Sequence, residues 1–129
     1  MAASLHSGYR NPMSYMLMIM EPVGQRTERG VDAGKEVYAR MLRFTDDLKA
    51  RGVLLASESL ASEDKGVRVQ VRAGRSRLVD GPFAEAKEMI GGFFLLNCKT
   101  RDEALAIAAQ CPAAEWCTVE VREAAPCYA

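Results

Sequence analysis

Two short segments of the chain are apolar without the polar residues that would mark a water-facing side. Residues 14–20 read SYMLMIM, and residues 93–96 read FFLL. A strand with one wet face alternates apolar and polar residues, whereas an unbroken apolar run predicts a strand that is covered on both faces. We therefore expect two strands in the interior of a sheet, each in need of a cover on either side.

A long amphipathic helix is predicted over residues 35–51, where apolar residues mostly recur at intervals of three and four between charged ones. Gly52 follows, and glycine is favoured just beyond a helix end because it accepts a left-handed conformation. The polar residues 24–34 are predicted to form a loop or the frayed start of this helix.

A second, shorter helix is predicted after residue 100. Thr100 and Glu103 have the spacing of a capping box, and Pro112 disfavours helix at the residue before it. The helix should therefore end at about Gln110. Residues 118–122 (TVEVR) alternate again and predict the last strand.

The middle of the chain predicts a strand followed by a hairpin. Residues 53–61 begin as a strand, and residues 67–72 (VRVQVR) alternate strictly with the period of two expected of a strand. Residues 73–74 (Ala-Gly) can turn the chain, and residues 75–79 can return as the partner strand. The hairpin is thus predicted as a two-stranded insertion.

The resulting order is strand, helix, strand, hairpin, strand, helix, strand. It predicts an α+β fold of the ferredoxin-like split βαβ type with an inserted β-hairpin, in which an antiparallel sheet carries both helices on one face. The other face then has no cover within one chain. Because the apolar strands require one, we expect a homodimer that packs sheet against sheet.

Length and charge further limit the number of domains and the kinds of partner to expect. The chain has 129 residues, which suits a single domain over residues 13–129, and residues 1–12 are expected to form a flexible N-terminal extension. The 17 basic and 17 acidic residues cancel, so no positive field exists to attract nucleic acid directly. The apolar run 16–20 is too short to span a membrane, and residues 1–12 have no apolar segment of the kind a signal peptide needs, so a cytoplasmic location is expected.

The four cysteines form no Cys-x-x-Cys pair and have no nearby histidine. This pattern predicts neither a metal site nor a cofactor, and it favours reduced, structural thiols.

Five segments together resemble a known family: MSYMLMIM, LKARGVL, VDGPFAEAKEMIGGFFLL, AAQCPAA and TVEVRE. They resemble the YCII-related family, in the branch with the Asp-Gly-Pro-Phe (DGPF) motif, from residue 14 to about residue 128. The resemblance implies the dimeric α+β barrel form of the ferredoxin-like fold. It also implies a link to extracytoplasmic-function sigma factors for some members.

Some YCII-type relatives look like enzymes built on a His-Asp pair, with a dehalogenating lactone activity among the assignments. The only histidine here is His6, in the expected extension. The pair is therefore not carried over, and whether the chain is an enzyme stays open.

Candidate catalytic residues are Asp80 and Glu58. Asp80 either folds its carboxylate onto backbone amides of the Asp-Gly-Pro turn, or acts as a base at the mouth of a pocket. Glu58 lies within a Ser- and Leu-rich strand (LLASESL) and points either toward Asp80 as a second acid or out to solvent.

Candidate ligand-binding residues follow the same turn. Phe83 is either a pocket wall or a core side chain, Lys87 binds an anionic substrate or pairs at the surface, and Glu88 lies beside it. Arginines at positions 68, 72, 75 and 77 form a basic patch on the hairpin. It either binds phosphate or an acidic partner, or only keeps the strand edges from aggregating.

Two functions follow from these residues. The first is a small-molecule binding or weak acid-base catalytic pocket near Asp80-Gly81-Pro82-Phe83. The alternative is a non-catalytic regulatory protein, linked to sigma-factor signalling, that docks a protein partner through the hairpin.

Overall fold

The computed structural model describes residues 14–129, so the expected extension and His6 lie outside the described residues. Four strands, β1 (Ser14–Pro22), β2 (Leu54–Ser59), β5 (Glu88–Asn97) and β6 (Thr118–Glu123), form an antiparallel sheet in the order β2-β5-β1-β6. Strand β5 separates β1 from β2, and β1 separates β5 from β6. Each β-α-β unit is therefore split by a strand of the other, which confirms the predicted α+β topology.

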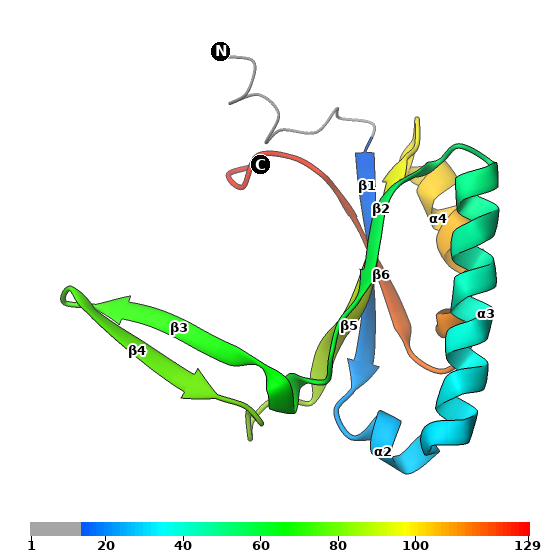
Figure 1. The fold of residues 1–129 in the computed structure, drawn as a ribbon. Coiled ribbons are helices and arrows are strands. Elements are labelled where there is room, and N and C mark those ends of the chain that lie inside the picture. The colour runs from blue at the N-terminus through cyan, green and yellow to red at the C-terminus, as the bar shows by residue number, and fades with distance from the viewer. Residues whose placement is uncertain (1–13) are drawn as a thin grey trace.

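Two helices cover one face of this sheet, α3 (Val31–Ala50) and α4 (Arg101–Gln110), as Figure 1 shows on the right of the sheet. Thr100 caps α4 as predicted, with the Glu103 amide donating to Thr100 Oγ1 over 3.1 Å, while the Glu103 carboxylate reaches back to accept from the Lys99 amide over 2.9 Å. After α4, the short turn η2 (Pro112–Glu115) leads into β6. The helical layer thus lies entirely on one side.

For residues 24–34 the structure contradicts a loop and bears out the alternative that the helix begins within this stretch. A short helix, α2 (Gln25–Arg29), forms there, and α3 begins at Val31. Gly30 separates the two helices with a φ of +87°, a left-handed conformation that glycine adopts without steric cost. The chain therefore changes direction between α2 and α3 rather than fraying.

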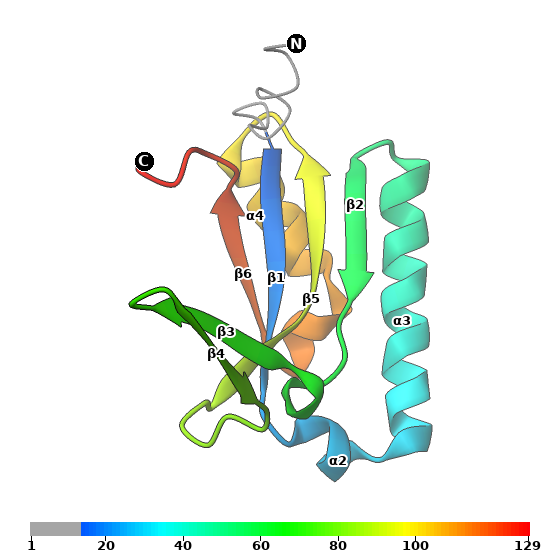
Figure 2. The ribbon, with the colours of Figure 1, turned by 60° about the vertical axis from the view of Figure 1, so that its left-hand side comes forward.

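The predicted hairpin is confirmed as a separate two-stranded sheet of β3 (Val67–Arg72) and β4 (Arg75–Asp80). Its turn residues, Ala73 and Gly74, have φ values of +52° and +75°, and positive φ at both central residues matches the right-handed twist of a hairpin. The turn η1 (Glu63–Lys65) connects β2 to it. Figures 1 and 2 show that the hairpin projects from the sheet on the side away from α3.

The two faces of the main sheet differ in cover. On the helix side, the rings of Phe44 in α3 and Phe94 in β5 meet edge to face, with centroids 5.2 Å apart. The other core side chains from the central strands are Tyr15, Leu17, Ile19 and Leu96.

The alternate positions of β1 and β5 form what we call the open face: Met16, Met18, Met20, Phe93 and Leu95. Four of these five side chains are only half-buried, and Leu95 is buried among its neighbours. Within the described chain, the apolar central strands are therefore covered fully on one face and not on the other.

Candidate functional site

A cavity of about 920 Å³ lies between α3 and the sheet. It exists because only the second half of α3 packs closely, where Phe44 and Leu48 are buried. In the first half, Tyr38 and Leu42 remain 51% and 46% exposed although both line the cavity. We call this space the α3 cavity, and its size is typical of small-molecule sites.

A largely buried ion pair lies in the wall of the α3 cavity. Glu21, near the end of β1, is only 7% exposed, and it accepts from Arg26 of α2 with an Nη2 to Oε1 distance of 2.6 Å. The Arg26 Nε also donates to the same oxygen over 3.1 Å. Two donors on one carboxylate fix both side chains, as in other charge-assisted pairs.

Two glycines of β5 make room for this arrangement. A Cβ on Gly91 would overlap the Glu21 carboxylate and come within 3.0 Å of Arg26 Nη2. A Cβ on Gly92 would lie 2.8 Å from the backbone oxygen of Glu58 on the neighbouring strand. Both positions therefore require glycine: Gly91 because the Glu21 side chain lies close to it, and Gly92 because the backbone of β2 does.

Helix α2 closes one end of the cavity through Trp116, which follows η2. Gln25 Nε2 donates to the Trp116 carbonyl over 2.7 Å. The guanidinium of Arg29 lies over the indole ring at 5.8 Å, and that of Arg40 at 5.3 Å. The Arg40 guanidinium is oriented by a bidentate pair of hydrogen bonds to the Glu115 carboxylate. Such cation-π contacts hold the indole in place at the cavity wall.

The charges that line the α3 cavity are predominantly positive. Arg26, Arg29 and Lys49 all contribute to its walls. Glu21 points inward but is already paired with Arg26. Glu58 contributes from the edge strand β2, although its side chain lies on the opposite face. The cavity can therefore accept a negative charge more readily than a positive one.

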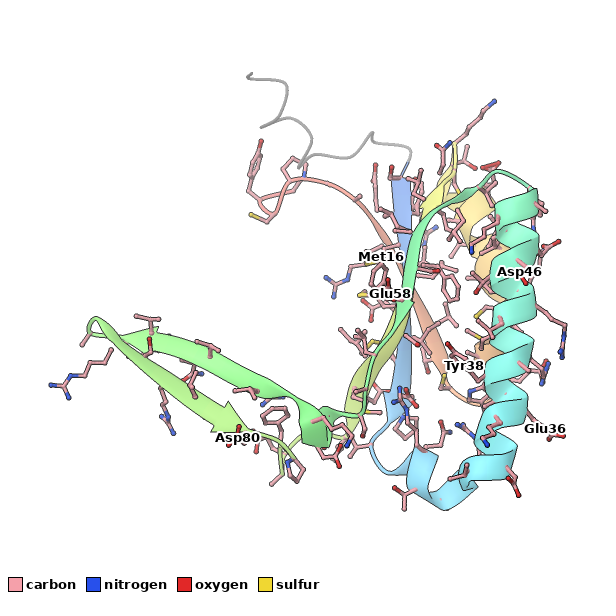
Figure 3. The ribbon with its side chains drawn as sticks, in the orientation of Figure 1. Met16, Glu36, Tyr38, Asp46, Glu58 and Asp80 are labelled. Carbon is pink, nitrogen blue, oxygen red and sulfur yellow. The ribbon has the colours of Figure 1, made fainter. Side chains whose placement is uncertain are left out.

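The structure settles the orientation of Glu58. It pairs with Phe93 in register, and Phe93 pairs with Met18, so its side chain lies on the open face. Figure 3 shows it on the side of the sheet away from α3, whereas Asp80 lies out on the hairpin. Within one chain, Glu58 and Asp80 therefore do not lie together at one site.

The turn after Asp80 is held by a different carboxylate from the one considered in the sequence. The Phe83 amide donates to Glu63 Oε1 over 2.8 Å, and the Gly81 amide donates to the Gly66 carbonyl over 2.8 Å. Asp80 itself is exposed at the end of β4. The carboxylate that accepts from a backbone amide of the turn is therefore that of Glu63 in η1, and not that of Asp80.

The predicted ligand-binding residues do not gather at one site. Phe83 is half-buried and lines a smaller cavity of about 310 Å³ on the hairpin, with Arg68 lying over its ring. Lys87 and Glu88 are exposed, and neither lines this cavity or the α3 cavity. The structure thus associates only Phe83 with a cavity near the turn.

Sequence reasoning missed the two charged residues that matter most in the α3 cavity. Arg26 falls in the polar stretch 24–34, for which a loop or a frayed helix start is predicted, and Glu21 directly follows the apolar run 14–20. One signal did exist for Glu21. It continues the parity of Tyr15, Leu17 and Ile19, so in an unbroken strand its side chain points toward the helices.

The cysteines do not add a nucleophile to this site. Burial raises the pKa of the Cys117 thiol to about 11, with the nearby Glu21 carboxylate adding to the effect. Burial also raises the pKa of Cys98 and of Cys111. These three thiols are protonated at neutral pH, and a protonated thiol is a poor nucleophile.

A thiol-labelling experiment checks which cysteines are buried and which is exposed. At pH 7.5 we expect Cys127, which is exposed, to react with an aromatic disulfide reagent much faster than the other three. Cys127→Ser should remove the fast phase and leave the slow ones unchanged. Two or more fast phases in the native protein would contradict the burial described above.

Residues 14–129 hold no cluster of side chains typical of a metal site. In this range no three His, Cys, Asp or Glu side chains gather closely enough to hold a metal ion. None of its helices combines the length and apolar character needed to cross a membrane.

Comparison with known proteins adds two findings. The family model of the YCII-related domain matches residues 13–127. An uncharacterized protein of Rhizobium meliloti (strain 1021) is 53% identical over 36 residues, a match that covers 28% of this chain and 29% of the relative.

Proposed function

This chain belongs to the YCII-related domain family, and we propose that it binds a small amphipathic anion in the α3 cavity. One observation carries the proposal. A cavity of about 920 Å³ is lined by apolar side chains of α3 and contains a fixed, largely buried ion pair in its wall. Apolar pockets with a few oriented polar groups are the usual form of small-molecule sites.

The lining indicates the chemistry of the ligand. Tyr38, Met41 and Leu42 from α3 offer an apolar surface, and Trp116 offers the face or edge of an indole. Arg26 donates to Glu21 through Nε and Nη2, which leaves Nη1 for a ligand carboxylate. An apolar body with one negative group therefore fits better than a cation or a sugar.

A cavity-filling pair of variants tests this proposal. Gly34 lies in α3, lines the α3 cavity and has no atom within 4 Å of where its Cβ would be. Because a Cβ at Gly34 meets no other atom, we expect a phenylalanine there to extend into the cavity, whereas an alanine gives only the gain in helix propensity. The probe is the medium-chain carboxylate decanoate, and the readout is the fluorescence of Trp116, the only tryptophan.

We expect decanoate to change Trp116 emission saturably in the wild type and in Gly34→Ala. In Gly34→Phe the apparent dissociation constant should rise at least tenfold. Equal binding to both variants would show that decanoate lies elsewhere, and no saturable change in the wild type would reject the proposed ligand class.

Acid-base catalysis at the Asp80 turn receives less support from the geometry. Glu58 lies on the open face of the sheet, and Asp80 lies on the hairpin. A pair of acids for general acid-base work must both reach one substrate. Within one chain these two carboxylates do not share a cavity.

We also propose that the protein is a homodimer that pairs open face to open face, in the manner of a dimeric α+β barrel. The open face presents a row of methionines on β1 beside Phe93 and Leu95 on β5. An apolar sheet face of this kind is buried in stable domains, and nothing in residues 14–129 covers it fully. A second copy supplies an identical, self-complementary surface.

The hairpin supports the same assembly. Its valines at positions 67, 69 and 71 are more than half exposed, as is Leu78 opposite them. A two-stranded sheet is only marginally stable alone, so an exposed apolar hairpin needs a surface to pack on. Because it projects on the side of the open face (Figure 1), a copy bound there lies within its reach.

A further inference from the structure

The two faces of the hairpin carry different chemistry. In the β3-β4 register, Arg68 pairs with Val79, Gln70 with Arg77 and Arg72 with Arg75. Residues directly opposite each other share a face. Four arginines therefore lie on one face, which we call the arginine face: Arg68, Arg72, Arg75 and Arg77.

A hollow of about 310 Å³ lies at the base of the arginine face. Arg68 and Arg77 line it from the two strands, and Pro82 and Phe83 line it from the turn. As diagonal neighbours on one face, the two arginines are close enough for their long side chains to reach one ligand. The hollow is separate from the α3 cavity and shares no lining residue with it.

One of these guanidinium groups is held in place before any ligand arrives. The Arg68 guanidinium carbon lies 3.7 Å from the centroid of the Phe83 ring. The backbone of Phe83 is itself fixed by the bond from its amide to Glu63, and its ring leaves little room at Gly66, where a Cβ would lie 3.6 Å from it. At Gly81 a Cβ would overlap the Glu63 carbonyl oxygen, so the turn packs closely against η1 there.

The positive charge of the arginine face exceeds the negative charge of the carboxylates that pair with it. Arg72 lies directly opposite Arg75, an arrangement of like charges that destabilises a strand pair. Among the residues that line the hollow, the one carboxylate is that of Glu85, which lies 3.6 Å from Arg68 and is 81% exposed. The Glu63 carboxylate is not among them and accepts from a backbone amide of the turn. Interspersed charges of both signs would protect strand edges equally well, so edge protection alone does not explain a face of one sign.

We propose that the hollow binds an oxyanion of the phosphate class between Arg68 and Arg77. Guanidinium groups recognise phosphate oxygens through paired N–H bonds, and a ring-stacked arginine keeps its fork oriented for this. The ligand is either inorganic phosphate or the phosphate group of a small phosphomonoester. The proposal does not depend on the α3 cavity holding a ligand.

Titration calorimetry at low ionic strength tests it, with inorganic phosphate and glycerol 3-phosphate as separate probes. Arg77→Gln removes one charge, and Arg68→Lys keeps the charge but loses the planar fork. Arg101→Gln, on the exposed start of α4, removes one charge far from the hairpin in the fold and is the matched control. All three positions are exposed, and thermal unfolding verifies that each variant is folded.

We expect at least one probe to bind the wild type, and the tighter one identifies the source of the phosphate group. Affinity should fall at least fivefold in Arg77→Gln and in Arg68→Lys, and less than twofold in Arg101→Gln. Equal losses in all three variants would reduce the effect to net charge and overturn the site. So would binding of an acidic glutamate-rich peptide, dependent on Arg68 and Arg77, by a protein that binds neither phosphate probe.

Discussion

Replacing Gly91 with alanine is expected to lower the free energy of unfolding by about 2–3 kcal/mol. The added Cβ would overlap the Glu21 carboxylate and push it away from Arg26. Breaking a buried ion pair leaves a charge without a partner, and that cost dominates. The expected value lies below the figure for a fully buried pair because the Arg26 side chain is 36% exposed.

Urea unfolding of Gly91→Ala and Gly34→Ala measures this effect against a control of the same chemistry. At Gly34 the added methyl group meets no atom within 4 Å and lies within a helix, so we expect a gain of up to about 1 kcal/mol. The two changes should thus have opposite signs. A loss below about 0.5 kcal/mol for Gly91→Ala would mean that Glu21 moves freely and that the pair is not fixed.

Introducing a charge on the open face should convert the proposed dimer into a monomer. Met18 lies in the middle of β1 with its side chain on that face, beside Phe93. In a symmetric interface Met18→Asp places two carboxylates in an apolar contact, and burying an unpaired charge is strongly unfavourable. We expect the dimer dissociation constant to rise at least 100-fold.

Sedimentation velocity at micromolar concentration distinguishes the species. The wild type should sediment with twice the chain mass of 14.1 kDa, and Met18→Asp with the mass of one chain. Leu105→Asp is the matched control, because Leu105 is partly exposed on α4 on the far side of the sheet. A wild-type monomer, or a Met18→Asp dimer, would contradict the proposed assembly.

The fold was predictable from local pattern to a large extent. The strict alternation of residues 67–72 and the capping residues Thr100 and Glu103 act over a few positions, and the structure has the elements they predict. Helix α2 was missed because its five residues are polar and have no apolar periodicity. Its form depends on distant partners, such as the Trp116 carbonyl that accepts from Gln25.

The candidate site was less predictable for the same reason. Glu21 and Arg26 are close in sequence, but their burial depends on Gly91, which is 65 positions from Arg26. Asp80 and Phe83 belong to the Asp-Gly-Pro-Phe motif, so the sequence alone favours them as site residues. In the structure, the motif glycine Gly81 is explained by backbone packing against Glu63, and the large cavity lies elsewhere.

A crystal structure of the protein with decanoate tests the central claim most directly. The account predicts the alkyl chain in the α3 cavity between Tyr38 and Trp116, with the carboxylate within hydrogen-bond distance of the Arg26 guanidinium. Decanoate on the open face or on the hairpin, with the α3 cavity empty of it at saturating concentration, would contradict the account.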